Sequence, residues 1–64
     1  MIRFIVFDRF TGEVVSKNVA SEDILEHYNS TATFGTLVVG REISESDYDS
    51  ALNKTVNLDE RKLQ

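Results

Sequence analysis

The chain has 64 residues and no cysteine, and its 11 acidic and 7 basic side chains give a net charge of −4. This length allows one small domain, and the absence of thiols excludes disulfides and thiolate metal sites. The acidic balance disfavours nucleic-acid binding, which needs clustered Lys and Arg, and no run approaches the ~18 apolar residues of a transmembrane helix. No secretory signal is recognisable. We therefore expect a cytoplasmic protein with no nucleic-acid or membrane partner.

The first segment, residues 2–8, combines aromatic and β-branched residues over the length of one strand. Alternation places Phe4 and Val6 on one face of this strand and Ile5 and Phe7 on the other. Because both faces are apolar, the strand is predicted to be buried on both sides, either in the centre of a sheet or against a partner.

A turn follows at residues 8–12, and it has the residues that a bulged hairpin needs. The carboxylate of Asp8 can accept hydrogen bonds from the next backbone amides, and Gly12 can adopt the left-handed conformation that closes the hairpin. Phe10 lies inside this turn, so its side chain either folds back on the sheet or stays exposed for contact. We favour the folded-back position.

Residues 13–19 are predicted to form the return strand of the hairpin. This segment is less apolar than the first strand, as is usual for an outer strand. Alternation separates its side chains into two sets, with Val15, Lys17 and Val19 on one side and Val14, Ser16 and Asn18 on the other.

A short helix is predicted over residues 22–28, with Ser21 as its N-cap and acidic side chains in its first turn. Its apolar face consists of Ile24, Leu25 and Tyr28. A helix of about two turns is not stable alone, so this one must dock on the sheet.

Residues 34–40, bounded by glycines, are predicted to form a third strand. These elements together predict an α+β fold, in which the hairpin and one or two further strands form a small antiparallel sheet with one short helix. A single domain is expected over residues 1–58. The charged tail at residues 59–64 is expected to be mobile or held only by a neighbouring molecule.

Residues 43–52 fit two structures. Ser44 or Ser46 could cap a short helix, with Tyr48, Ala51 and Leu52 as its apolar face. Alternatively, residues 48–52 could form a strand that turns at residues 53–54 into a second strand at residues 56–58. We favour this hairpin, because the alternation at residues 55–58 is typical of extended chain.

The sequence contains few candidates for catalytic, metal-binding or phosphate-binding residues. His27 could serve as a general base, but a lone histidine on a helix is far more often a surface residue. The acids Glu45, Asp47 and Asp49 have the spacing of a calcium loop, yet Ser50 and Val56 occupy the positions where that loop needs Gly and Glu. The three glycines form no phosphate-binding loop. We therefore assign no catalytic, cofactor-binding or metal-binding residue and expect no enzymatic activity and no cofactor.

Five aromatic side chains are candidates for contact with another protein, namely Phe4, Phe10, Tyr28, Phe34 and Tyr48. A chain of this size buries only ~60% of the surface that its unfolded form exposes, so part of the apolar area is available for an interface. The alternative, in which these residues form the single core, remains open.

The order of elements resembles a class of small tailed-phage virion and tail-associated proteins. The matching residues are Val6-Phe7-Asp8, Thr11-Gly12-Glu13-Val14-Val15, Glu22-Asp23-Ile24-Leu25, Leu37-Val38-Val39-Gly40 and Tyr48. The resemblance implies an α+β virion component made in the host cytoplasm. It also implies a role as an adaptor or decoration on a tail, tail fibre or capsid, with other virion proteins or copies of itself as partners. A small regulatory protein that inhibits a host or defence protein is the alternative.

Overall fold

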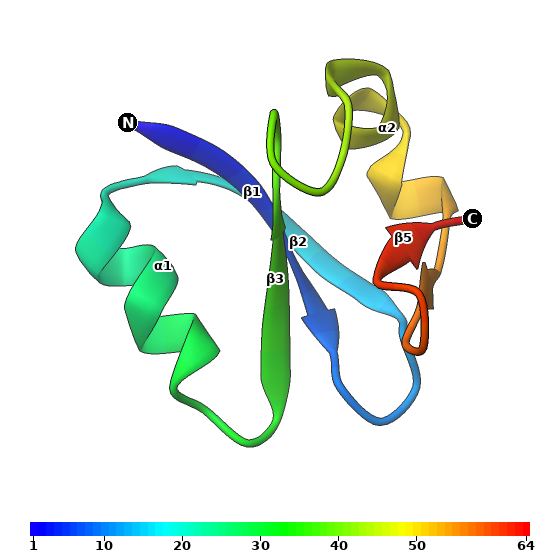
Figure 1. Cartoon of the computed structure of the whole chain (residues 1–64), viewed down its shortest axis with the longest axis horizontal. Helices are drawn as coiled ribbons and strands as arrows, with labels where there is room; N and C mark the ends of the chain where they lie inside the picture. Colours follow the sequence, from blue (N-terminus) through cyan, green and yellow to red (C-terminus); the bar gives the residue numbers. More distant parts are fainter.

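The computed structural model describes all 64 residues and shows a three-stranded antiparallel sheet covered on both faces (Figure 1). The sheet has the order β2-β1-β3, with β1 at Ile2–Asp8, β2 at Val14–Ala20 and β3 at Phe34–Val38. One face is covered by α1 (Glu22–Asn29). The other is covered by α2 (Glu45–Asp49), the 3-10 helix η1 (Ala51–Asn53) and a ribbon of β4 (Val56–Asn57) and β5 (Lys62–Leu63). The predicted α+β class is confirmed.

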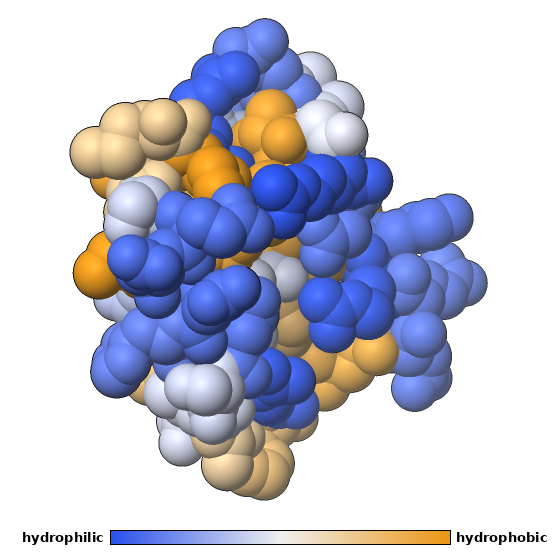
Figure 2. Space-filling view, turned by 60° about the vertical axis from the view of Figure 1, so that its left-hand side comes forward, coloured by the Kyte–Doolittle hydropathy of each residue, from blue (hydrophilic) through white to orange (hydrophobic).

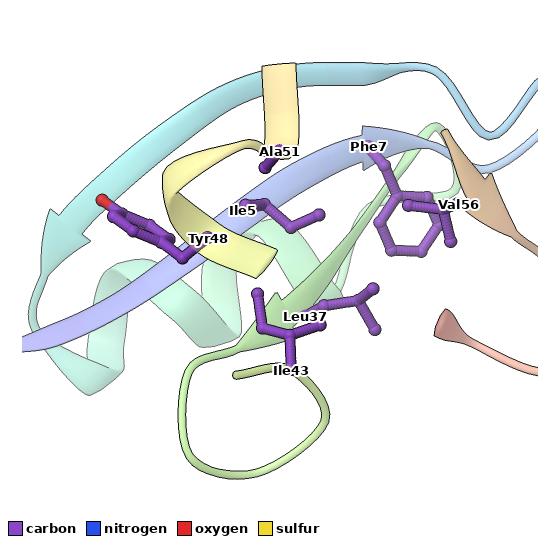
Figure 3. Packing of buried hydrophobic residues seen from close by; sticks show 7 residues of the cluster. All are labelled: Ile5, Phe7, Leu37, Ile43, Tyr48, Ala51 and Val56. Atoms are coloured by element: carbon purple, nitrogen blue, oxygen red, sulfur yellow. The ribbon is translucent and has the colours of Figure 1, made fainter. Parts of the chain in front are cut away.

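The central strand β1 explains the two-sided core. Phe4 and Val6 point towards α1, where they pack with Leu25. Ile5 and Phe7 point to the opposite face, where they join a second apolar cluster with α2, η1 and β4 (Figure 3). The alternation predicted for this strand is therefore confirmed, and its central place in the sheet accounts for the burial of both faces.

The hairpin turn has the predicted chemistry. One carboxylate oxygen of Asp8 accepts hydrogen bonds from the amides of Phe10 (2.7 Å) and Thr11 (3.2 Å). Gly12 follows with a φ of +80°, in the left-handed region that favours glycine. Its amide donates to the carbonyl of Asp8 at 2.9 Å, which closes the loop.

A β-bulge in β2 corrects one sequence-based expectation. Val6 is paired with Ser16 and Phe7 with Val14, so one extra residue, Val15, lies between the two pairs. The extra residue turns Val14 to the face of Phe7, where it packs against the second cluster. The prediction that Val14 shares a face with Ser16 was therefore wrong, because simple alternation cannot anticipate a bulge.

Helix α1 docks through a narrower face than predicted. Leu25 is buried and Tyr28 is half-buried, but Ile24 is 46% exposed. Adjacent helix residues are about 100° apart around the axis, so Ile24 faces away when Leu25 faces the sheet. Ser21 occupies the N-cap position as predicted, although its side chain forms no capping hydrogen bond.

The favoured hairpin at residues 48–58 was wrong, and the helical alternative was right. Ser44 caps α2, and its side chain accepts a hydrogen bond from the Asp47 amide at 3.1 Å, while Asp47 reaches back to the Ser44 amide. Tyr48 and Ala51 are buried as the apolar face, whereas Leu52 is 62% exposed. The reciprocal cap satisfies amides that would otherwise lack a partner at the helix start.

The C-terminal residues pair with the chain itself. Thr55 and Gln64 exchange two backbone hydrogen bonds, at 3.2 and 2.9 Å, beside the β4–β5 ribbon. Leu63 packs against the second cluster. The tail that we expected to be mobile or held by a neighbour is thus held by an internal partner. Val56 is extended as expected, but it pairs with Leu63 and not with residues 48–52.

Candidate protein-contact surface

Two of the five predicted contact residues belong to the core. Phe4 has no exposed surface, and Tyr48 is 9% exposed. Phe4 lies beneath α1 because β1 is the central strand, and Tyr48 is held over the opposite face by α2. These two side chains stabilise the fold and are not accessible to a partner, so their assignment as contact residues is corrected.

Tyr28 and Phe34 are half-buried at the border of the α1 side. The ring of Tyr28 makes edge-on contacts with Phe4, at a centroid distance of 6.2 Å, and with Phe34, at 6.4 Å. Such edge-to-face pairs add about 0.5–1.5 kcal/mol beyond the area that they bury. The two residues therefore fasten α1 to the sheet and leave only part of each ring accessible.

Phe10 differs from the other four because it is 76% exposed at the hairpin tip. The favoured prediction, in which this ring folds back on the sheet, was wrong. The capping of the turn by Asp8 fixes the backbone at Phe10, which leaves its side chain directed to solvent. On the face drawn in Figure 2, apolar side chains reach the surface only in small groups among hydrophilic ones.

The hairpin tip is anchored on both sides of Phe10. The amide of Arg9 donates to Thr33 at 2.9 Å, and its guanidinium bonds to the carbonyls of Phe34 and Asn29. On the other side, the carbonyl of Gly12 accepts a hydrogen bond from the Val56 amide. The role of Arg9 could not be predicted from the sequence, because its acceptors are backbone carbonyls that are distant along the chain. These bonds tie the tip both to the segment before β3 and to β4.

Two of the three acidic residues of α2 are paired with cations, and one of these two also belongs to the helix cap. Glu45 forms an ion pair with Arg3, and Asp47 lies 3.0 Å from the ammonium of Lys54. Hydrogen bonds from Lys54 and then from Ser44 lower the pKa of Asp47. No three His, Cys, Asp or Glu side chains are grouped so that they could share a metal ion. His27 is exposed on α1, as predicted.

The shift at Asp47 predicts a pH dependence. Its pKa should lie below that of an ordinary aspartate, and Lys54→Ala should raise it, because the lysine supplies the largest stabilising bond. The pKa of Asp47 is lower in the folded than in the unfolded chain, so its ionised carboxylate stabilises the fold. This stabilisation is complete above the unfolded-state pKa. It is lost as the pH falls through the folded-state pKa. NMR titration of the carboxyl carbon measures the pKa. Lys62→Ala is the control, and equal values in both variants would contradict the assignment.

Two cations flank the ring of Tyr48 over the sheet. The ammonium of Lys17 lies 4.7 Å from the ring centroid, and the guanidinium of Arg3 lies 5.7 Å from it. The Tyr48 hydroxyl points towards β2 and donates to the carbonyl of Asn18 at 3.4 Å (Figure 3). Attraction between a cation and an aromatic face therefore draws the Lys17 side chain over the α2 side of the sheet.

Comparison with known proteins finds no matching family model, no similar curated protein and no similar solved structure. None of the helices combines the length and apolar character needed to cross a bilayer. The surface has no pocket. The arrangement that stands out chemically is the exposed aromatic ring of Phe10 on an anchored hairpin tip.

Proposed function

We propose that this chain is a non-enzymatic interaction module that serves as an accessory component of a tailed-phage virion. It would be an adaptor or decoration on a tail, tail fibre or capsid. The observation that carries this proposal is Phe10, which is 76% exposed on a turn whose backbone is fixed by hydrogen bonds on both sides. The resemblance to small tail-associated proteins supports it, because the matched Phe-Asp and Thr-Gly residues form this hairpin.

An anchored aromatic ring suits protein contact for an energetic reason. A phenylalanine ring can bury ~150–250 Å² against a partner. Binding also costs conformational entropy when a loop must become ordered, and a turn that is already ordered avoids much of this cost. The Asp8 carboxylate and the Val56 amide order the tip before any partner arrives. Phe10 would then insert into an apolar recess of a neighbouring virion protein.

The test is the presence of the protein in gradient-purified particles, measured by quantitative mass spectrometry. We expect a stoichiometric copy number for the wild type and a loss of at least tenfold for Phe10→Ser. Ile24→Ser is the matched control, because Ile24 is also an exposed apolar residue but lies on α1. Circular dichroism should show both variants folded. Absence of the wild type from particles, or equal retention of both variants, would refute the proposal.

One observation favours a second candidate, a small regulatory protein that binds and inhibits a host or defence protein. Both faces of the sheet are covered within one copy, and the C-terminal ribbon pairs internally. The fold therefore needs no neighbour to complete it, as suits a freestanding protein. Light scattering combined with the particle assay would separate the two candidates. The regulatory role is supported by a folded monomer that is absent from particles and forms a stoichiometric complex with one host protein.

A further inference from the structure

The two outer edges of the sheet differ in their protection. Along β3, the carbonyl of Thr36 accepts a hydrogen bond from the guanidinium of Arg61 at 3.2 Å. The amide of Val38 donates to the carboxylate of Glu42 at 3.0 Å. Side chains therefore occupy the backbone groups that an added strand would need, and this edge is closed to pairing.

The hydrogen-bond pattern shows which backbone groups of β2 face outward. The carbonyl of Arg3 bonds to Val39, next to β3, and the amide of Asp8 bonds to Glu13, next to β2. Since successive residues of a strand direct their backbone groups to opposite sides, the odd residues of β1 face β3 and the even ones face β2. The registered partners that face β1 are therefore Ser16, Asn18 and Ala20, whereas the backbone groups of Lys17 and Val19 face outward.

Beyond the bulge at Val15, the outer edge of β2 is open at Lys17 and Val19. No bond from a turn, loop or side chain reaches the backbone of Val15, Lys17 or Val19. Another segment pairs with this edge only just before β2, where Thr55 is bridged to Glu13, while η1 packs against the strand itself. Free backbone donors and acceptors at an edge provide a template for another strand, which is the basis of peptide recognition by strand addition.

Side-chain chemistry along this edge indicates what would pair with it. Val15 and Val19 are 53% and 57% exposed, and Lys17 lies between them. None of the four ion pairs of the molecule includes Lys17, whose ammonium lies over the ring of Tyr48 without a carboxylate partner. Residues directly opposite each other in an antiparallel pair have Cβ atoms ~4.5–5.5 Å apart, and opposite charges are favoured there.

We infer that the β2 edge binds an extended segment of a partner protein. That segment has an acidic residue opposite Lys17 and aliphatic residues two positions away on each side, opposite Val15 and Val19. This inference rests on the proposed role as an interaction module and adds a second contact to the one made by Phe10. Backbone hydrogen bonds to Lys17 and Val19 hold the segment, and the charge of Lys17 selects a segment with an acidic residue at the opposite position.

Charge argues against a second copy of this chain as the occupant. Two β2 strands that pair about a two-fold axis, so that each Val15 meets Val19 of the other copy, would place Lys17 opposite Lys17 of that copy. Like charges at directly opposed positions are destabilising. Each copy also carries a net charge of −4, which adds repulsion. A segment with an acidic centre has neither disadvantage.

The test uses two synthetic peptides with the patterns Thr-Val-Thr-Glu-Thr-Val-Thr and Thr-Val-Thr-Lys-Thr-Val-Thr, titrated to millimolar concentration against the isotope-labelled full chain. We expect the Glu peptide to shift the amide signals of residues 15–19 and to slow hydrogen exchange at Lys17 and Val19. We also expect it to bind about fivefold more tightly than the Lys peptide. In the free protein, the Lys17 and Val19 amides should exchange faster than those of Ser16 and Asn18.

Two variants separate backbone pairing from charge. Lys17→Glu should reverse the preference, so that the Lys peptide binds more tightly. Val19→Pro removes an outward amide and should abolish binding while the fold remains, because that amide does not bond to β1. Val19→Thr is its control, since it keeps the amide. The charge reversal alone remains decisive if the proline variant does not fold.

Three outcomes would overturn the inference. The first is no shift of residues 15–19 with either peptide, the second is an unchanged preference in Lys17→Glu, and the third is a concentration-dependent dimer with exchange protection along β2. Failure here is distinguishable from failure of the proposed function. The particle assay depends on Phe10, which lies at the other end of β2 from Val19, whereas the peptide titration reports on the edge alone.

Discussion

Replacing Gly12 with valine should destabilise the fold by roughly 2–4 kcal/mol. Gly12 has a φ of +80°, and a side chain in this left-handed region costs about 1–2 kcal/mol. A Cβ atom at this position would also collide with the carbonyl oxygen of Val56. Relief of the collision would stretch the bond from the Val56 amide to the Gly12 carbonyl, which is 2.7 Å long, and a backbone bond contributes about 1 kcal/mol.

Urea unfolding followed by circular dichroism measures this effect, and Gly40→Val is its control. Gly40 has a φ of +86°, but an added Cβ there would meet no heavy atom within 4 Å. The free energy of unfolding of that variant should therefore fall only by the cost of a side chain on a left-handed backbone, about 1–2 kcal/mol. At ~0.05–0.15 kcal/mol per residue, the whole domain has about 3–10 kcal/mol of stability. Equal losses in both variants would show that the approach of Gly12 to β4 has no energetic role.

Local signals predicted the first half of the fold. The apolar run of β1 specifies a strand through its own side chains. Asp8 specifies the turn through bonds to residues two and three positions away, and Gly12 closes it through its own backbone conformation. These contacts span few residues, so the sequence pattern contains the information that places them. The strands, the turn and the position of α1 could accordingly be predicted without a structure.

The second half of the fold was predicted less well for two reasons. Some of its contacts join residues that are distant in sequence, and the local capping signal for α2 was given less weight than the alternation after it. Ser44 and Asp47 have the spacing of a reciprocal cap, which is a local signal for α2, but the alternation at residues 55–58 led us to favour a hairpin there. Val56 does lie in an extended strand, as that alternation indicated, but its partner is Leu63. No local rule identifies this partner, because pairing with the tail becomes favourable only when Leu63 packs on the second cluster.

The candidate contact residues could be chosen by residue type, but their exposure could not be predicted. Aromatic content indicated five candidates, yet exposure depends on which layers cover each face of β1. Phe4 and Phe10 are both phenylalanines of the N-terminal hairpin, and one is fully buried while the other is 76% exposed. The outward backbone groups of β2 were equally hidden, because identifying them requires the strand order and the register of β2 on β1.

Truncation of Phe4 to alanine should cost about 3–5 kcal/mol, whereas the same truncation of Phe10 should change stability by less than about 0.5 kcal/mol. Phe4 is 0% exposed, and it contacts the ring of Tyr28 at a centroid distance of 6.2 Å. Removal of its ring leaves a cavity beneath α1, and the fold also loses the free energy gained by transferring the ring out of water. Phe10 leaves no cavity, because solvent already surrounds most of its ring.

Thermal and urea unfolding of the two variants, measured side by side, would decide whether α1 is held as described. Phe4→Leu provides a graded control: it keeps much of the buried volume but loses the aromatic contact, so its loss should be clearly smaller than that of Phe4→Ala. A Phe4→Ala variant as stable as Phe10→Ala would mean that Phe4 is accessible and that α1 does not cover it. Phe4 would then have to be removed from the core, and it would again be a candidate for contact with a partner.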